Sequence, residues 1–349
     1  MLIRDESIKT GLIIGCGSIG RKYLSVMQER YKKVLVVDID REYVNELNQL
    51  NSSQIRAFTE IEAMMDHVLL NPLDMVAVIS NWGPDHFSTY MKLVNYGIKR
   101  IIVEKPLVTS KKLAYEIYEH AKLNNVLLIP AMPRRYSGYY NKIKKELVAE
   151  NLGKPEVMTM VGGAQCIATN GIHWLDLACQ LFESFPHSVY AKIHESRINP
   201  RSQKLGFYEG NASWFFPELK QFSINLTNSS YFRAEINLIC EYGALRIDNS
   251  GDVTIHKLSN TNQIITDTPI TRVLGTLTKK QIKIDLSDDA ISQQIQAAEG
   301  MIELRYSVED SLEVINALIC AFEASEKNTP IEINSINEMQ NYNKEWNFS

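Results

Sequence analysis

The first third of the chain alternates short apolar runs with segments whose apolar residues recur about every 3.6 positions. The apolar runs predict buried parallel strands at residues 11–14, 34–37, 75–80, 100–104 and 126–129. The periodic segments predict a helix after the first strand and further helices at residues 42–50, 60–67, 86–96 and 111–123. This alternation is typical of an α/β domain with a doubly wound parallel sheet, which we place at residues 8–132.

The pattern changes after Pro133, where helices are predicted at residues 140–149 and 172–181. β-rich stretches predict strands at residues 155–161, 188–193, 212–216, 222–226, 232–242 and 244–247. A long helix is predicted at 308–326, followed by a loose polar tail at 336–349. We therefore expect residues 133–349 to form a second, α+β domain with an open, mainly antiparallel sheet and helices on one face.

Composition narrows the possible functions. A length of 349 residues favours two domains, and 45% hydrophobic residues can build sizeable cores. The net charge of −4 offers no general attraction to nucleic acid or to anionic membranes. No apolar run approaches the roughly 20 residues of a bilayer span, and the polar first residues lack the apolar core of a secretion signal.

The cysteines are odd in number and scattered without metal-ligand spacing: Cys16, Cys166, Cys179, Cys240 and Cys320. Because most of them have apolar neighbours, we expect buried free thiols and no metal site. These features together fit a protein of the reducing cytoplasm.

A glycine-rich motif joins the first predicted strand to the helix that follows it, and it consists of Gly15, Cys16, Gly17, Ser18, Ile19 and Gly20. In a Rossmann domain the first glycine permits the tight turn, the second admits a pyrophosphate, and the third lets helix pack on strand. The helix N-terminus then faces the phosphates. The alternative is a glycine-rich turn that binds nothing, but the flanking strands favour a dinucleotide site.

The second predicted strand ends in Asp38, eighteen residues after Gly20. A carboxylate there can accept hydrogen bonds from an adenosine ribose and repels a 2′-phosphate, so NAD is favoured over NADP. Arg41 complicates this preference, because a guanidinium can pair with such a phosphate.

Lys105 follows a buried strand at the carboxyl edge of the sheet, where open α/β folds bind their ligands. A partly desolvated lysine there can act as an acid or base near neutral pH. His173 begins a predicted helix, and Asp176 shares its face and can orient the imidazole ring. Taken singly, Lys105 could equally be an exposed lysine at a strand end, and His173 a capping or core residue.

The combination of motifs resembles the Gfo/Idh/MocA family of NAD(P)-dependent oxidoreductases, across nearly the whole chain. The matching segments are the glycine motif, Glu104-Lys105-Pro106, Arg134-Arg135-Tyr136-Ser137, Gly171-x-His173-x-x-Asp176 and Ser307-Val308-Glu309-Asp310. The resemblance implies that Lys105 binds or relays the proton of the reacting hydroxyl and that His173 is the principal acid/base. It also implies a cis bond before Pro106.

One position departs from the family pattern. Many relatives carry an aspartate four residues before the histidine, where this chain has Thr169, followed by Asn170. Neither side chain can take up a proton as a carboxylate does. A different substrate geometry or reaction type therefore becomes more plausible.

The resemblance also indicates supporting residues. Ser80, Asn81, Trp82, His86 and Glu104 are expected at the cofactor, together with the glycine motif, Asp38, Arg41 and Lys105. Arg134, Arg135, Tyr136, Thr169, Asn170 and Asp176 are expected at the substrate, with Lys105 and His173. The alternatives are packing for Trp82 and Tyr136 and solvated surface positions for the two arginines.

The sequence thus favours an NAD-dependent oxidoreductase acting on a secondary alcohol of a sugar, nucleotide sugar or cyclic polyol. The second domain is expected to build a homodimer or homotetramer through its open sheet, as in relatives. One alternative is an enzyme that holds NAD tightly and recycles it during elimination, epimerisation or glycoside cleavage. Another is a non-catalytic NAD-binding regulator.

Overall fold

The computed structural model describes residues 10–50, 53–67, 71–200, 204–232, 234–248, 252–258, 277–283 and 289–348. Residues 8 and 349, the outer limits suggested for the two domains, lie outside these ranges. The chain forms two compact units. The first contains Met1–Ser137, Asp288–Ile315 and Ser335–Ser349, and the second contains Gly138–Ser287 and Asn316–Asn334.

The first unit is built on a parallel sheet in the order β3-β2-β1-β4-β5-β6. Its strands are β1 (Thr10–Ile14), β2 (Lys33–Val37), β3 (Ile55–Phe58), β4 (Met75–Ile79), β5 (Arg100–Val103) and β6 (Leu127–Pro130). All residues of β1 and β4 are buried, as expected for strands that are covered on both faces. The doubly wound α/β domain is therefore confirmed.

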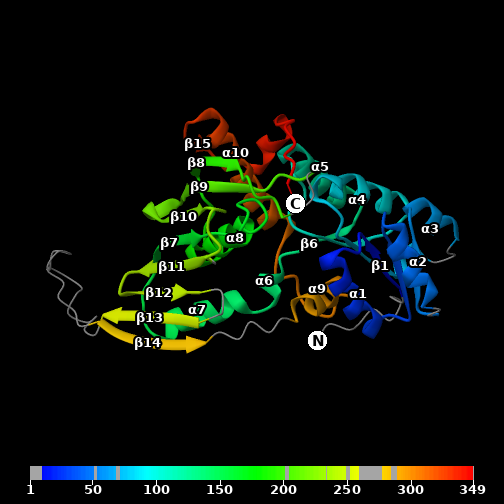
Figure 1. The fold of residues 1–349 in the computed structure, drawn as a ribbon, viewed down its shortest axis with the longest axis horizontal. Helices are drawn as coiled ribbons and strands as arrows, with labels where there is room; N and C mark the ends of the chain where they lie inside the picture. Colours follow the sequence, from blue (N-terminus) through cyan, green and yellow to red (C-terminus); the bar gives the residue numbers. More distant parts are fainter. Residues whose placement is uncertain are drawn as a thin grey trace. The chain divides into compact units, whose positions relative to one another are not determined.

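Helices cover both faces of this sheet, with α1 and α9 on one face and α4 and α5 on the other (Figure 1). The helices are α1 (Ser18–Arg30), α2 (Arg41–Gln49), α3 (Ile61–His67), α4 (His86–Asn95), α5 (Lys111–Leu123), α6 (Pro133–Tyr136) and α9 (Ala290–Ala298). Short 3₁₀ turns lie at η1 (Pro72–Asp74), η2 (Gly83–Asp85) and η6 (Ile336–Asn341). Helix α10 (Val308–Lys327) belongs to the first unit up to Ile315 and to the second from Asn316.

The second unit holds a mixed, mainly antiparallel sheet in the order β14-β13-β12-β11-β7-β10-β9-β8-β15. Only the pairing of β7 with β10 is parallel among its described strands. The strands are β7 (Pro155–Gly162), β8 (Ser188–Glu195), β9 (Tyr208–Phe215), β10 (Gln221–Leu226), β11 (Glu235–Cys240), β12 (Gly243–Ile247), β13 (Asp252–Leu258), β14 (Leu277–Lys283) and β15 (Ile331–Glu332). The predicted α+β architecture with an open sheet is confirmed.

Helices α7 (Tyr139–Ala149), α8 (Gly171–Phe182) and the second part of α10 complete this unit, and a 3₁₀ turn, η3 (Pro217–Leu219), joins β9 to β10. Trp214 of β9 marks the core, because it is fully buried and its indole N–H donates to the carbonyl of Ala317 at 2.9 Å. Its ring stacks on Phe222 with 5.3 Å between centroids. Apolar burial of this kind holds α10 against the sheet.

The sequence interpretation missed several described elements, namely β3, β13, β14, β15, α6 and α9. Strand β3 is a four-residue edge strand with an exposed Arg56, so its apolar signal is weak. Helix α9 is rich in glutamine, although its fully buried Gln294 and Ile295 face the interior. Both therefore depend on tertiary burial that local sequence patterns do not report.

The segment after residue 335 is not the loose tail that the sequence suggested. It contains η6, and its Met339, Trp346 and Phe348 are buried. The division into units also differs from the expected one, because residues 288–315 and 335–349 pack in the first unit instead of the second. The physical reason is that these returning segments carry apolar and buried polar side chains which complete the first core.

Two further properties follow from the described residues. All five cysteines are buried and free, as the sequence indicated. Among the described helices, none combines the length and apolar character that crossing a bilayer requires.

Candidate functional site

The turn between β1 and α1 is shaped by its glycines. Gly15 has a φ of +83°, and a Cβ there would lie 2.5 Å from the backbone nitrogen of Asn81. A Cβ on Gly20 would lie 2.2 Å from the carbonyl oxygen of Gly15. A Cβ on Gly17, by contrast, would meet no atom within 4 Å. Two glycines are thus required by the fold, and the third leaves open space for another molecule.

That open space adjoins the N-terminus of α1. The first N–H groups of an α-helix have no partner within the helix, and here Gly17 is the N-cap, with no capping side-chain bond and no acidic residue in the first turn. Ser18 and Ile19 are exposed at this end. The helix therefore presents N–H groups and a positive dipole end to an anion such as a pyrophosphate.

Asp38, at the end of β2, holds the glycine turn. Its Oδ2 accepts the N–H of Cys16 at 2.6 Å, and its Oδ1 accepts the N–H of Asp40 at 2.9 Å. Each carboxylate oxygen can accept more than one hydrogen bond, so Asp38 can still bind a ribose hydroxyl. Arg41 is exposed at the first residue of α2.

Cys16 contributes its backbone to the turn, because its side chain is buried. Its Sγ lies 3.5 Å from the hydroxyl of Tyr43, and burial raises the pKa of the Cys16 thiol. The guanidinium of Arg21 lies 4.4 Å from the centre of the Tyr43 ring. The backbone of Cys16 can therefore make the predicted cofactor contact, while its buried thiol stays protonated at neutral pH.

A cavity of about 500 Å³ lies beside the glycine turn. Its lining includes the predicted residues Gly15, Gly17, Asp38, Ser80, Asn81 and Trp82. It also includes Ile39, residues 59–62, Thr89 and Lys92, which the sequence interpretation missed. Residues 59–62 follow β3, so recognising that strand would have located this wall of the cavity.

The loop after β4 is tied to the glycine turn. The hydroxyl of Ser80 donates to the carbonyl of Gly15 at 2.7 Å, and the side-chain amide of Asn81 donates to the Thr89 hydroxyl at 2.9 Å. Trp82 remains 37% exposed at the cavity, which is enough to face a ligand. The structure thus brings the predicted cofactor residues of β1, β2 and β4 together at one sheet edge.

Lys105 lies at that same edge, directly after β5, and its bond to Pro106 is cis as the resemblance implied. Glu104 points inward, with 7% exposure, and its Oε2 accepts the N–H of Lys105 at 3.2 Å. Burial raises the pKa of Glu104, although the nearby Lys105 opposes that rise. Glu104 therefore supports the turn that carries Lys105 through this hydrogen bond to its backbone.

Helix α9 contributes to this support. The hydroxyl of Tyr23 donates to Gln294 Oε1 at 2.6 Å and lies 3.4 Å from Glu104 Oε1. Since a hydroxyl carries one hydrogen, the shorter contact takes it, and a protonated Glu104 can donate to Tyr23 in return. No sequence motif indicated Gln294, which lies 189 positions after Lys105.

His86 was expected at the cofactor, but the structure gives it another place. Its ring is 1% exposed, with Nδ1 2.9 Å from the carbonyl oxygen of Pro106 and Nε2 3.1 Å from that of Asn81. Both ring nitrogens therefore face backbone carbonyl oxygens, and a neutral ring donates to one of them. His86 is buried at the start of α4, and residue type alone does not reveal such burial.

The second unit carries the predicted acid/base segment at the start of α8. His173 is half-buried in the first turn, and its carbonyl accepts the Tyr140 hydroxyl at 2.6 Å. Asp176 follows three residues later and is fully buried. Thr169 is 2% exposed, and Asn170 Oδ1 accepts the N–H of Cys166 at 3.0 Å, so this amide stabilises the loop before α8.

The side chains of α6 differ in how deeply they are buried. Arg135 is 8% exposed, lies 3.6 Å from Asp310 Oδ2 and stands 4.6 Å from the centre of the Tyr306 ring. Tyr136 is fully buried, which raises its pKa. These two side chains are buried in the first unit, so Arg135 is not a solvated surface residue, and the substrate contacts expected of both stay predictions. Arg134 is half-buried.

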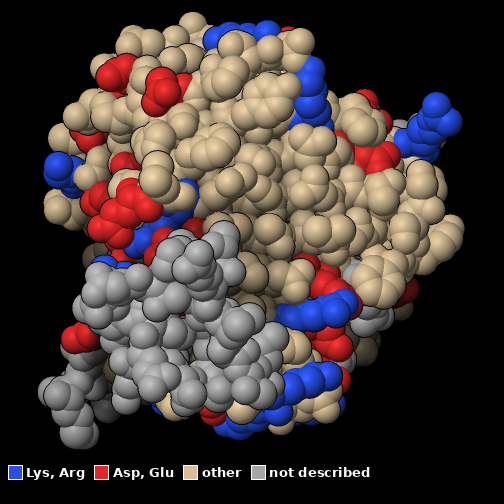
Figure 2. All heavy atoms as spheres, turned by 90° about the vertical axis from the view of Figure 1, so that its left-hand side faces the viewer, with Lys and Arg blue, Asp and Glu red and all other residues tan. Residues whose placement is uncertain are grey.

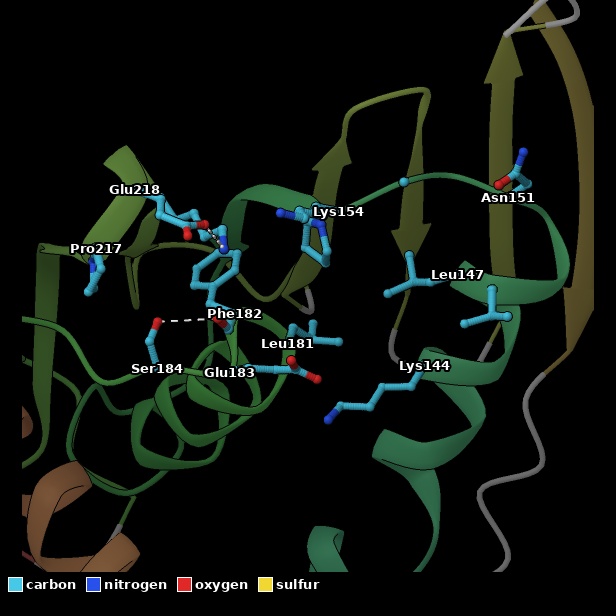
Figure 3. Close-up of a pocket in the computed structure, with 14 residues that line it drawn as sticks. Lys144, Leu147, Asn151, Lys154, Leu181, Phe182, Glu183, Ser184, Pro217 and Glu218 are labelled. Carbon is cyan, nitrogen blue, oxygen red and sulfur yellow. Dashed lines mark hydrogen bonds and ion pairs between the residues drawn. The ribbon is translucent and has the colours of Figure 1, made fainter. Parts of the chain in front are cut away.

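A separate cavity of about 670 Å³ lies within the second unit, near the C-terminal ends of α7 and α8 (Figure 3). Lys144, Lys154 and Glu183 line it, and Lys220 pairs there with Glu218 at 2.8 Å. Helix C-termini present carbonyl oxygens, which do not favour a pyrophosphate. This cavity contains none of the predicted site residues.

The described residues contain no cluster of three or more His, Cys, Asp or Glu side chains that could hold a metal ion. The donor set fits a dinucleotide instead: an open cradle at Gly17, an uncapped helix N-terminus and the Asp38 carboxylate.

The N-terminal part of the sequence matches a known protein family. Residues 9–132 match the Gfo/Idh/MocA family model, described as an oxidoreductase family with an NAD-binding Rossmann fold. An uncharacterised oxidoreductase of Escherichia coli, YhhX, is 24% identical over 210 residues, a match that covers 54% of this chain and 60% of that protein.

Solved structures extend the likeness in fold to nearly the whole chain. Myo-inositol 2-dehydrogenase from Lactobacillus plantarum matches with a TM-score of 0.69 and 16% identity, covering 93% of this chain and 99% of that one. A super-repressor mutant of Gal80p from Saccharomyces cerevisiae matches with a TM-score of 0.70 and 13% identity, covering 97% and 100%. Identities this low show the shared fold alone.

Proposed function

We propose that this chain, whose residues 9–132 match the Gfo/Idh/MocA oxidoreductase family model, is an NAD-dependent dehydrogenase or reductase. Its substrate would be a secondary alcohol of a sugar, nucleotide sugar or cyclic polyol, or the corresponding ketone. The observation that carries the proposal is the open cradle at Gly17 beneath an uncapped helix, at the same sheet edge as Lys105. The dehydrogenase neighbour from Lactobacillus plantarum supports the substrate class by analogy of fold.

The cofactor would be held by the first unit. The N–H groups at the start of α1 would bind the pyrophosphate, and Asp38 would bind the adenosine ribose. When bound, the nicotinamide supplies a site that accepts or returns a hydride. Asp38, Glu60 and Glu62 line the cavity and give it an acidic character, which favours NAD over NADP.

Lys105 and His173 would manage the proton of the reacting hydroxyl. Lys105 lies beside the buried carboxyl group of Glu104, and its positive charge opposes the rise in the pKa of Glu104 that burial causes. On α8 the buried Asp176 lies one turn from His173, a spacing that suits a carboxylate that orients an imidazole ring. Oxidation of an alcohol needs such a base within hydrogen-bond reach of the oxygen.

A Lys105→Met variant tests the proposal. It should bind NAD as wild type does, because the cradle and Asp38 are intact, but lose turnover by at least about 100-fold. The measurement is NADH absorbance in a screen of sugars, inositols and nucleotide sugars, with NAD affinity measured by calorimetry. Lys112→Met, on the exposed part of α5, is the matched control. Turnover in Lys105→Met equal to that of wild type would refute the assignment.

A second candidate function is a non-catalytic NAD-responsive regulator, because the Gal80p super-repressor shows that this architecture serves a repressor. The retained Lys105 and His173 favour the enzyme. A wild-type protein that binds NAD but turns over no alcohol in the screen, while NAD changes its affinity for a protein partner, would favour the regulator.

The open sheet of the second unit is proposed to join copies of the chain. Its central strands turn uncharged side chains outward, among them Thr159, Ser213, Ser223 and Asn225. The side of the molecule where these strands lie shows a broad area without charged residues (Figure 2). Two such faces can meet without burying unpaired charges.

Sedimentation velocity tests this association. Ser223→Glu places a charge at the centre of the face and should shift a dimer or tetramer toward monomer. The same substitution at the exposed loop residue Ser229 should leave the assembly unchanged. Identical sedimentation of Ser223→Glu and wild type would contradict the proposed interface.

A further inference from the structure

The turn that carries Lys105 runs from Glu104 to Ser110 between β5 and α5, and no helix or strand includes it. A lysine with catalytic duty needs a fixed backbone, because small displacements of reacting groups cost large factors in rate. The contacts that hold this turn therefore decide how Lys105 is presented.

One contact comes from inside the fold. His86 bridges the carbonyl of Pro106, next to Lys105, and the carbonyl of Asn81 in the loop that lines the cofactor cavity. The two distances are 2.9 and 3.1 Å, and the ring is buried. A single side chain thus links the lysine turn to the cofactor loop.

The imidazole ring of His86 has no second N–H to donate to another group. A neutral imidazole carries one N–H, and both nitrogens already face carbonyl oxygens. Burial lowers the pKa of His86, while the two carbonyls oppose that effect. The single N–H therefore donates to one of the two carbonyl oxygens at a time, while the ring lies against the backbone of both segments.

A second set of contacts comes from residues 342–348, which we name the strap. The N–H of Trp346 donates to the carbonyl of Thr109 at 3.0 Å. The ammonium of Lys111 lies 4.3 Å from the centre of the Tyr342 ring. Trp346 and Phe348 are buried, so these two side chains anchor the strap, while residues 343–345 are exposed.

Gly83 shows how closely these parts meet. A Cβ at this position would lie 2.8 Å from the carbonyl oxygen of Phe348, 3.2 Å from Thr109 Cγ2 and 3.5 Å from Pro106 Cγ. The 3₁₀ turn before α4, the lysine turn and the strap therefore converge on one residue that has no side chain. Any side chain there would push them apart.

We propose that His86 and the strap are positioning elements that clamp the Lys105 turn from two sides and fix it relative to the cofactor loop. This inference rests on the proposed function for the role of Lys105, but the clamp itself is a property of the backbone. It assigns a purpose to the packed strap and to a histidine whose ring faces neither solvent nor the cofactor cavity.

Hydrogen exchange of the full-length protein without cofactor tests the clamp directly. His86→Phe keeps a ring of similar size but removes both nitrogens, and Gly83→Ala inserts a methyl group at the convergence point. In both variants we expect amides of residues 105–110 to exchange at least about tenfold faster. Exchange in β1 should not change.

Steady-state kinetics adds a readout that a merely structural role would not move. Because His86 also fixes Asn81, His86→Phe should lower kcat by about 10- to 100-fold and weaken NAD binding. Gly83→Ala should lower kcat with a smaller effect on NAD affinity. His86→Gln, which can still donate to a carbonyl, should recover part of the loss.

His120→Phe in α5 is the matched control, because His120 contacts the Tyr90 hydroxyl rather than the lysine turn. It should leave exchange at residues 105–110 unchanged. Wild-type exchange there in both His86→Phe and Gly83→Ala would overturn the proposal, as would faster exchange with unaltered kcat. If His86→Phe does not fold, Gly83→Ala decides alone. Should wild type prove inactive, the exchange data still test the clamp, and only the proposed function fails.

Discussion

Replacing Gly17 by alanine separates cofactor binding from folding. Gly17 has φ −70° and ψ −154°, so its backbone lies at the edge of the extended region and outside the left-handed region that favours glycine. Its added Cβ would meet no protein atom within 4 Å. The methyl group would instead occupy the space over the start of α1 that we assign to the pyrophosphate.

The effect on stability should be small because two terms oppose each other. Alanine at an N-cap is less favourable than glycine by about 0.5–1 kcal/mol. The reduced freedom of the unfolded chain returns about 0.4–1 kcal/mol. The free energy of unfolding should therefore stay within about 1 kcal/mol of wild type.

The effect on NAD affinity should be large. A hydrogen bond to a charged partner is worth about 1.5–3 kcal/mol, and the methyl group would remove at least one between a backbone N–H and the pyrophosphate. The Kd for NAD should rise by about 10- to 150-fold. Calorimetry gives the Kd, and thermal unfolding without cofactor gives the stability.

Gly20→Ala is the contrasting variant, since its Cβ would lie 2.2 Å from the carbonyl oxygen of Gly15. We expect it to lower the free energy of unfolding by about 1–3 kcal/mol. If Gly17→Ala bound NAD with wild-type affinity, the assignment of the cradle to the pyrophosphate would be refuted.

Three other substitutions test separate parts of the structure. Asp38→Asn keeps an acceptor for the Cys16 N–H but removes the charge, so the ratio of NADP to NAD dissociation constants should fall by at least about fivefold; an unchanged ratio would mean that Asp38 does not select NAD. Glu104→Gln should be more stable than wild type at pH 8, because burial raises the pKa of Glu104 and ionising it in the folded state costs free energy. That advantage should shrink as pH falls toward 4.5, where the carboxyl group takes up its proton, and urea unfolding at both pH values would detect the opposite trend. Trp214→Phe leaves the Ala317 carbonyl without its indole donor and should lower the free energy of unfolding by about 2 kcal/mol; a loss near zero would show that this bond is replaced.

The glycine motif, Asp38 and Lys105 could be placed from sequence because each comes after a strand that ends in an apolar, buried run: β1, β2 and β5. Such strands are buried on both faces and leave a strong local signal. The edge strand β3 lacks that signal, so the cavity wall at residues 59–62 was missed.

Roles that depend on tertiary partners could not be read in this way. Arg135 looks like a substrate ligand in the sequence, yet Asp310 and Tyr306 pair with it inside the first unit. His86 looks like a cofactor contact, yet carbonyl oxygens on both sides engage its ring. Residue type predicted a polar function in both cases, and the burial and partners of these side chains became visible only in the structure.

Helix α9 has a consequence for any attempt to work with pieces of this protein. Its Glu299 pairs with Arg30 of α1, and its Gln294 meets Tyr23, although it lies more than a hundred positions beyond the last strand of its own sheet. In a fragment that ends at residue 132, the face of the sheet that α1 and α9 cover would be exposed to water. Arg30 would also lose its ion pair with Glu299. An exchange of N-terminal halves between relatives, made to change the cofactor preference, would therefore fail unless α9 is exchanged together with them.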